Sequence, residues 1–195
     1  MDNFEALVAQ ILERDGYWVR QSVYVKLSKE EKRDLGKPSL PRPQIDLVAY
    51  SPKRNEIILY EVKSYLDSPG VKINVLKNSS WAENHFKLLT IPAYQKIVVK
   101  SLLSRLGQEG LITQKAPRVK FGLAFGNSPK NERAQLKEYV KQQGWEYLGP
   151  DEIVAGLNDI AGESYHNSPY SFVAKMIFRN PMSDERQAGP ENSDD

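Results

Sequence analysis

Three charged residues in the first third of the chain have the types and the spacing of a catalytic centre. Asp46 lies in the segment QIDLVAY, and fifteen residues later Glu61 and Lys63 form a Glu-x-Lys pair in EIILYEVK. Both segments are rich in aliphatic and β-branched residues, and SPKRN between them favours a turn, so the sequence predicts an antiparallel hairpin. A register that pairs Ser51 with Glu56 also places Asp46 opposite Glu61, with their Cβ atoms about 5 Å apart. Glu61 and Lys63 share one face of their strand because side chains alternate along it.

Hydrolysis of a phosphodiester bond needs groups of these types. Two neighbouring carboxylates can hold a hard divalent cation, which lowers the pKa of a bound water and polarises the phosphate. A lysine beside them can orient that water and stabilise the negative charge that develops in the transition state. The chain has no cysteine and two histidines, so the expected ligands are oxygens and the expected ion is Mg²⁺ or Mn²⁺.

The spacing alone does not single out this trio, because Asp15 is also followed fifteen residues later by a Glu-x-Lys pair, Glu30 and Lys32. Glu30 stands in SKEEKRD, a charged run typical of a solvated surface. Glu61 and Lys63 end an apolar strand, where burying charge is costly unless pairing or function compensates. The context favours the second match, and the alternative interpretation of that match is a salt bridge at the end of a strand.

The elements around the hairpin predict an α/β class, a mixed β-sheet flanked by helices. The pattern predicts a helix over 3–15, a strand within 17–27, a loop over 28–43 and a long loop over 64–91 beside the site. Further along, it predicts a helix over 93–108, a strand over 119–126, a helix over 128–144 capped by Ser128, and a short strand over 145–148. Two more helices are expected over 151–162 and 168–180.

This order of elements, with an acid on the second strand and Glu-x-Lys on the third, resembles the PD-(D/E)xK nuclease superfamily over about residues 1–126. Ile45 stands where the motif name has proline. The resemblance implies a restriction-endonuclease-like sheet with extra C-terminal helices. It also implies that Asp46 and Glu61 bind the metal with the backbone carbonyl of Val62, and that Lys63 serves the attacking water. On the first helix it makes Glu5 a candidate to support the site, the alternative being an ordinary exposed glutamate.

Other residues near the hairpin are candidates for nucleic-acid contacts. Gln95, Lys96 and Lys100 lie on the helix predicted over 93–108 and can face phosphates, or they form a solvated face. The 64–91 segment interleaves basic and aromatic residues, which suits phosphate pairing and base stacking; they are Tyr65, Lys72, Lys77, Trp81, His85, Phe86 and Lys87. Trp81 and Phe86 can instead fill a small core of their own.

Charge divides the chain into a basic body and an acidic end. Residues 1–180 hold 26 basic and 20 acidic side chains, whereas residues 181–195 carry five acids and one arginine. We therefore expect a single nuclease-like domain over 1–180 and a disordered acidic tail over 181–195. A basic body is compatible with a nucleic-acid partner, for which DNA is the first choice.

Taken together, the residues and the resemblance favour a Mg²⁺-dependent endo- or exodeoxyribonuclease, and an RNA-processing nuclease is a further alternative. The resemblance implies a role in restriction, repair, recombination or defence. The alternative is a non-catalytic nucleic-acid-binding or assembly module on the same fold. The sequence shows no membrane-length apolar run and no secretion signal, so the cytoplasm is the expected location. The predicted helix over 168–180 is apolar nearly all round, which predicts burial either in its own core or in a homodimer.

Overall fold

The computed structural model describes residues 2–112, 116–164 and 166–179. The chain divides into two compact units, residues 1–153 and 154–195. The predicted acidic tail, 181–195, lies outside the described residues. Within the described residues, no helix is long and apolar enough to cross a membrane.

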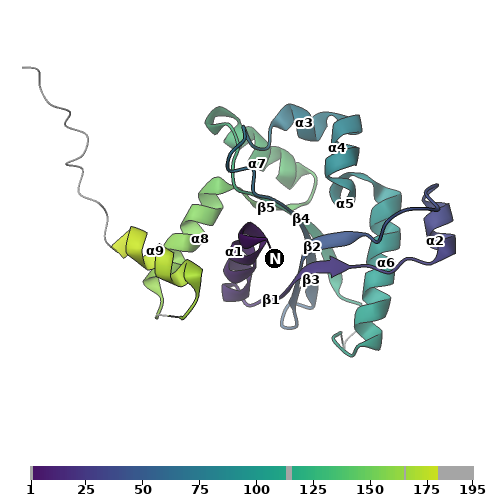
Figure 1. Cartoon of the computed structure of the whole chain (residues 1–195), viewed down its shortest axis with the longest axis horizontal. Helices are drawn as coiled ribbons and strands as arrows, with labels where there is room; N and C mark the ends of the chain where they lie inside the picture. Colours follow the sequence, from purple (N-terminus) through teal and green to yellow (C-terminus); the bar gives the residue numbers. More distant parts are fainter. Residues whose placement is uncertain (1, 113–115, 165, 180–195) are drawn as a thin grey trace, which may run out of the picture. The chain divides into compact units, whose positions relative to one another are not determined.

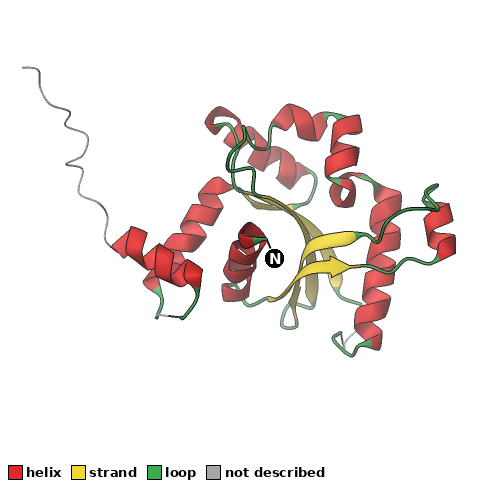
Figure 2. Ribbon diagram, viewed as in Figure 1, coloured by secondary structure: helices red, strands yellow, loops and turns green. Residues whose placement is uncertain are grey.

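The first unit is built on a five-stranded mixed sheet, which confirms the predicted α/β class (Figure 2). Its strands are β1 (Trp18–Tyr24), β2 (Gln44–Ser51), β3 (Glu56–Lys63), β4 (Arg118–Phe125) and β5 (Glu146–Leu148), and they lie in that order across the sheet. The pairs β1–β2 and β2–β3 are antiparallel, whereas β3–β4 and β4–β5 are parallel. The β2–β3 hairpin therefore joins the two halves of the sheet.

Helices cover both faces of this sheet (Figure 1). On one face, α6 (Pro92–Gln108) packs Val98, Leu102 and Leu106 against Ile57 and Leu59 of β3. On the other lies α1 (Asn3–Arg14), whose buried face contains Val8, Ile11 and Leu12. The Asp2 side chain caps α1 by accepting the Phe4 N–H at 2.7 Å, which satisfies one of the free donors at the helix start.

The segment predicted as a long loop over 64–91 is largely helical, so that prediction was wrong. It contains α3 (Ile73–Lys77), α4 (Ser79–His85) and α5 (Lys87–Thr90). Val71, Leu76, Phe86 and Leu89 anchor it in a second core with Leu123, Phe125, Leu136 and Val140. Its helices are short, and their stability comes from this burial rather than from a periodic pattern long enough to detect in the sequence.

The predicted loop over 28–43 also contains a helix, α2 (Lys29–Asp34). A capping box starts it: the Ser28 hydroxyl accepts the Glu31 N–H at 3.1 Å, and the Glu31 carboxylate accepts the Ser28 N–H at 2.8 Å. The Ser-x-x-Glu spacing that signals such a box is present in the sequence. The many charged residues of the segment led to the prediction of a loop instead of this helix.

The start of the helix after β4 also differs from the prediction. A 3₁₀ turn, η1 (Lys130–Glu132), precedes α7 (Arg133–Gln142), and the N-cap residue is Glu132. Ser128 is therefore not the cap; it is buried, and its hydroxyl has no hydrogen-bond partner among the described residues. The Glu132 carboxylate instead accepts the Ile73 N–H at 2.8 Å, tying α3 to this turn.

Helix α8 (Pro150–Gly162) begins in the first unit and continues into the second, which also contains α9 (Pro169–Arg179). Lys175 and Arg179 of α9 both donate to the Ala161 carbonyl, at 2.9 Å each. Helix α9 buries Ser171 and Ala174 but leaves Phe172, Val173, Met176 and Ile177 exposed. The predicted homodimer stays a prediction.

Candidate active site

The β2–β3 hairpin has the predicted register, with Ser51 opposite Glu56 and Leu47 opposite Tyr60. Asp46 and Glu61 follow as the next opposed residues, where the ladder ends. There the Asp46 carboxylate takes the place of a backbone partner: its Oδ2 accepts the Val62 N–H at 2.8 Å. The aspartate is thereby fixed against β3, beside Glu61.

Glu61 and Lys63 lie side by side on the face of β3 that also carries Leu59. The Lys63 ammonium donates to Glu61 Oε1 at 2.6 Å, and the side chains are only 23% and 17% exposed. Lys63 Nζ also stands 5.9 Å from the ring centroid of the fully buried Phe86. The structure thus brings the three predicted residues of the trio together in a partly desolvated place.

The site holds two carboxylates against one ammonium, and their pKa values reflect it. Burial raises the pKa of Asp46, despite the opposing effects of the Val62 N–H and of Lys63. Burial likewise raises the pKa of Glu61; Lys63 opposes this, and the charge of Asp46 adds to it. Burial would lower the pKa of Lys63, but the Glu61 carboxylate outweighs it and raises that pKa, so the lysine stays charged. A further positive charge would stabilise both carboxylates in their ionised form.

Glu5 of α1 approaches the same aspartate from the other face of the sheet. Its pKa is raised by burial and by the charge of Asp46, in that order. The Ser22 hydroxyl donates to Glu5 Oε2 at 3.3 Å. Glu5 is therefore a partly buried carboxylate at the site and not an ordinary exposed glutamate.

Ser22 itself is a participant that sequence reasoning missed. Its neighbours Gln21 and Val23 pair with Leu47 and Ile45, so Ser22 falls opposite Asp46. Its φ of 51° lies in the left-handed region, which costs a residue with a side chain about 1–3 kcal/mol. This kink turns the hydroxyl towards Glu5. No local pattern in the sequence signals it.

Two residues on helices α5 and α6, Lys87 and Tyr94, also interact electrostatically with Glu61. The sequence did not predict that either of them lies near Glu61. Burial, and next the charge of Glu61, raise the pKa of Tyr94 to about 12, so its hydroxyl stays protonated. The charge of Lys87 lowers the pKa of Glu61. Lys87 was predicted only as one of several basic residues in the 64–91 segment, and Tyr94 was not singled out.

The other predicted contact residues are placed differently. Gln95 donates to the Leu89 carbonyl at 2.9 Å, which ties α6 to α5. Lys96 and Lys100 are exposed along α6. Tyr65 has a φ of 46° and lies near enough to influence Lys63, whereas Lys72 stands at the N-cap position of α3.

The second match to the spacing pattern does not form a site. Asp15 is exposed and pairs with Arg14 at 3.8 Å, and Glu30 and Lys32 lie on the helix α2 rather than on a strand. Of the two matches, the one at Asp46 has its acid and its Glu-x-Lys pair on neighbouring strands.

The donor set at the hairpin suits a hard divalent cation. Two carboxylates, Asp46 and Glu61, and the main chain of Val62 provide oxygen ligands of the kind that Mg²⁺ and Mn²⁺ prefer. Among the described residues, no group of three or more His, Asp or Glu side chains is arranged to hold an ion. Burial raises the pKa values of both carboxylates, and a bound divalent cation would favour their ionised form.

Comparison with known proteins adds little. No family model and no curated protein matches this chain. Among solved structures it is similar to a protein of unknown function, AF1548, with 14% identity, covering 90% of this chain and 93% of that one at a TM-score of 0.42. A similarity this low shows neither the fold nor the function of this chain.

Proposed function

We propose that this protein is a metal-dependent nuclease of the PD-(D/E)xK type, which hydrolyses phosphodiester bonds in DNA. One observation carries the proposal: Asp46, Glu61 and Lys63 converge where β2 and β3 part, with both carboxylates partly buried and the Lys63 ammonium on Glu61 at 2.6 Å. The element order, with antiparallel β1–β3 followed by parallel β4 and β5, agrees with a restriction-endonuclease-like fold extended by C-terminal helices.

Each group has a distinct part in this chemistry. Asp46, Glu61 and the Val62 carbonyl would hold Mg²⁺ or Mn²⁺, and a bound cation supplies an acidified water and a polarised phosphate. Lys63 places its ammonium beside Glu61, where it can donate to the attacking water and to a phosphate oxygen. The hydrogen bond from Val62 fixes Asp46 before any ligand arrives, so binding needs little rearrangement there.

The direct test is cleavage of labelled single-stranded, double-stranded and branched DNA, and of RNA, with Mg²⁺, with Mn²⁺ and with excess chelator. We expect DNA cleavage that requires the cation and is lost in Asp46→Asn and Glu61→Gln. The matched control is Asp15→Asn, from the second match, which should cut like the wild type. Full activity in chelator, or loss of activity in Asp15→Asn alone, would contradict the proposal.

A second candidate is a nucleic-acid-binding or assembly module without catalysis. The observation that favours it is that the three groups already have partners, with Lys63 on Glu61 at 2.6 Å and Asp46 on the Val62 N–H at 2.8 Å. On this hypothesis the trio stabilises the end of the hairpin. The same cleavage assay separates the two, because such a module would bind DNA without cutting it under any cation.

A further inference from the structure

A basic extension projects from the end of the sheet where the candidate site lies. The chain leaves β1 after Tyr24 and returns at Gln44 of β2, and we call residues 25–43 the α2 arm. The Val25 N–H donates to the Pro43 carbonyl at 2.8 Å, so the two limbs of the arm are paired at its base. Val25 and Leu27 are buried in the core with α6. Figure 1 shows the two limbs crossing α6, with α2 beyond it.

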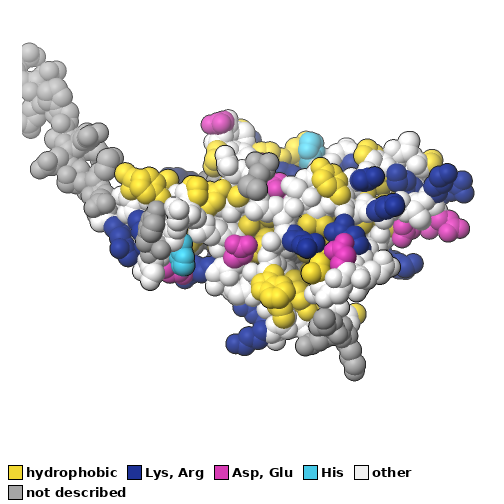
Figure 3. Space-filling view, turned by 60° about the horizontal axis from the view of Figure 1, so that its bottom comes forward, with side chains coloured by type: hydrophobic (Ala, Val, Ile, Leu, Met, Phe, Trp, Pro, Cys, Tyr) yellow, Lys and Arg dark blue, Asp and Glu magenta, His cyan; other side chains and the backbone are white. Residues whose placement is uncertain are grey.

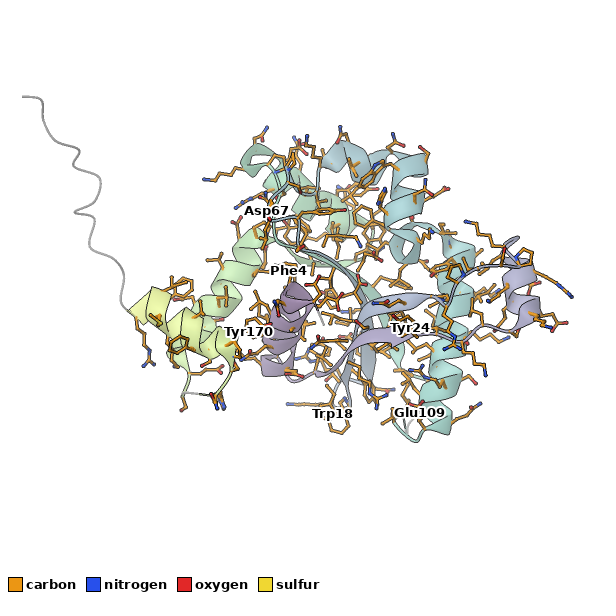
Figure 4. The ribbon with its side chains drawn as sticks, viewed as in Figure 1. Phe4, Trp18, Tyr24, Asp67, Glu109 and Tyr170 are labelled. Atoms are coloured by element: carbon orange, nitrogen blue, oxygen red, sulfur yellow. The ribbon has the colours of Figure 1, made fainter. Side chains whose placement is uncertain are left out.

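The arm is fastened to α6 and leaves a groove beside it. Ser101 donates to the Lys26 carbonyl at 2.9 Å, and Arg105 donates to the Tyr24 carbonyl at 2.6 Å. Figure 4 labels Tyr24 at this crossing and Glu109 at the far end of α6. Residues of the arm and of α6 line a groove of about 300 Å³, which we call the α6 groove. Its polar lining is Lys26 and Glu31 from the arm with Lys100, Ser101, Ser104, Arg105 and Gln108 from α6.

The α6 groove is positively charged. Three cationic side chains line it against one carboxylate, Glu31, which already accepts the Ser28 N–H. Arg105 is paired with Glu109 at 3.3 Å, so the positive charge of the groove comes from Lys26 and Lys100. Lys26 and Lys100 are exposed, and no carboxylate of the described residues lies within 4 Å of either. The whole arm carries six basic and three acidic residues. Figure 3 shows several Lys and Arg side chains, with some Asp and Glu side chains beside them, on the side of the first unit where Figure 1 labels α2.

The composition of the lining selects the ligand chemistry. The groove offers ammonium, guanidinium, hydroxyl and amide groups, which pair with phosphate oxygens. None of its lining residues is aromatic, so bases have no ring to stack on, as they would in a single-strand site. The lining therefore suits a continuous phosphate backbone whose bases are stacked elsewhere, as in a duplex.

The groove lies a short way from the candidate site. Lys26 is four residues along the chain from Ser22, which faces Asp46, so at about 3.3 Å per residue the two positions are at most about 13 Å apart. Lys100 is six residues from Tyr94 on α6, or about 9 Å along the helix axis. Phosphates follow one another every 3.4 Å of helix axis in one DNA strand, so the groove would meet the backbone roughly three or four nucleotides from the bond at the site.

We propose that the α6 groove binds the phosphate backbone of duplex DNA and holds it in line with the catalytic centre. This inference rests on the proposed function for its orientation, since it names the surface that carries the same substrate. The contacts are to phosphates alone, so the groove contributes affinity and register but no base recognition.

The test measures binding without cleavage, in chelator, by fluorescence anisotropy of labelled duplexes of two unrelated sequences across a range of salt. The variant is Lys26→Gln/Lys100→Gln. Its matched control is Lys53→Gln/Lys141→Gln, which removes two exposed lysines from the β2–β3 turn and from α7. Each phosphate contact contributes about 0.9 to the slope of log affinity against log salt. The groove variant should therefore lose about 1.8 from that slope, which is about 60-fold in affinity at 0.1 M salt if the affinities converge at 1 M.

Equal losses on both sequences, with the control variant unchanged, would support the groove. A groove variant that binds like the control, or a loss confined to one sequence, would overturn it, as would a wild type that binds no duplex at low salt. Cleavage by the wild type is scored separately. If Lys26→Gln/Lys100→Gln loses affinity while no cation produces cleavage, the groove stands and the nuclease proposal fails. If the wild type cuts DNA and the groove variant binds normally, the reverse holds.

Discussion

Replacing Asp46 with asparagine should stabilise the protein when no metal is present. The pKa of Asp46 is raised by burial even after its Val62 hydrogen bond and Lys63 are taken into account. A raised pKa in a carboxyl group means that the fold prefers the neutral form, so the ionised aspartate costs stability at every pH above that pKa. Asparagine has nearly the shape of the neutral acid and can still accept the Val62 N–H. The variant therefore removes a cost while keeping the contact.

The size of the effect follows from the conversion between pKa and free energy. Each pH unit by which a pKa is raised corresponds to about 1.4 kcal/mol, and in a chain of this size about 1 kcal/mol moves the melting temperature by roughly 2–4 °C. We expect Asp46→Asn to melt at a higher temperature than the wild type in chelator near pH 7.5, by about 3–6 °C for each pH unit by which the fold raises the pKa of Asp46. Adding Mg²⁺ should reverse the order. A cation at 100 times its Kd stabilises the wild type by about 2.7 kcal/mol, or about 5–10 °C, and should leave the variant unchanged.

Differential scanning calorimetry with a Mg²⁺ titration measures both effects in one experiment. Asp15→Asn is the matched control, because that aspartate is exposed and its removal should change neither melting temperature nor Mg²⁺ response. A drop of several degrees in the melting temperature of Asp46→Asn in chelator would contradict this reasoning. It would mean that the charged Asp46 carboxylate stabilises the fold through its hydrogen bond from the Val62 N–H. A wild type that gains no stability from Mg²⁺ or Mn²⁺ would refute the assignment of a cation to this site.

Three other outcomes follow from the same structure. Lys63→Ala should abolish cleavage while Mg²⁺ still raises the melting temperature, and a variant that cuts at the wild-type rate would remove the lysine from the mechanism. The number of protons released on Mg²⁺ binding, measured by calorimetry in two buffers, should grow as the pH falls towards the raised pKa values of Asp46 and Glu61. The affinity for Mg²⁺ should fall over the same pH range, and an affinity that does not depend on pH would contradict this prediction. Glu56→Ala should destabilise the fold by about 1.5–3 kcal/mol in urea unfolding, because this 2%-exposed carboxylate accepts hydrogen bonds from Tyr17 and Arg118 and pairs with Lys120. A loss below about 0.5 kcal/mol would show that these contacts do not stabilise the fold.

The hairpin and its register were accessible from the sequence because each rests on a short-range rule. Alternating apolar residues define the strands, and the four-residue connection between Ser51 and Glu56 fixes which residues face each other. Once Ser51 pairs with Glu56, the opposition of Asp46 and Glu61 follows by counting. The same counting places Lys63 beside Glu61.

The rest of the site depends on contacts between distant segments, which no local pattern records. Ser22 takes a left-handed backbone in a strand whose composition gives no sign of it. Tyr94 approaches Glu61 because α6 is laid over β3 by the burial of Val98 and Leu102. The short helices α3 to α5 form because Phe86 and Leu89 enter the second core, and that core is completed by residues about 40 positions further along the chain.

Two glycines show how the fold holds the start of the segment that follows Lys63. A side chain on Gly126 would lie 2.4 Å from the Ser64 carbonyl oxygen, and one on Gly70 would lie 2.1 Å from that of Asn127. The backbone after β3 therefore runs in direct contact with the backbone after β4. Hydrogen bonds lock the crossing: the Gly126 N–H donates to the Lys63 carbonyl at 3.0 Å, and the Val71 N–H donates to that of Asn127 at 2.9 Å. Lys63 is thus fixed through its own carbonyl, while Asp46 is fixed through its side chain on Val62. Glu61 lies on β3 between these two anchors, and its carboxylate accepts a hydrogen bond from the Lys63 ammonium at 2.6 Å. The three side chains are therefore held in place by contacts within the protein, which preorganises the candidate site before any ligand binds.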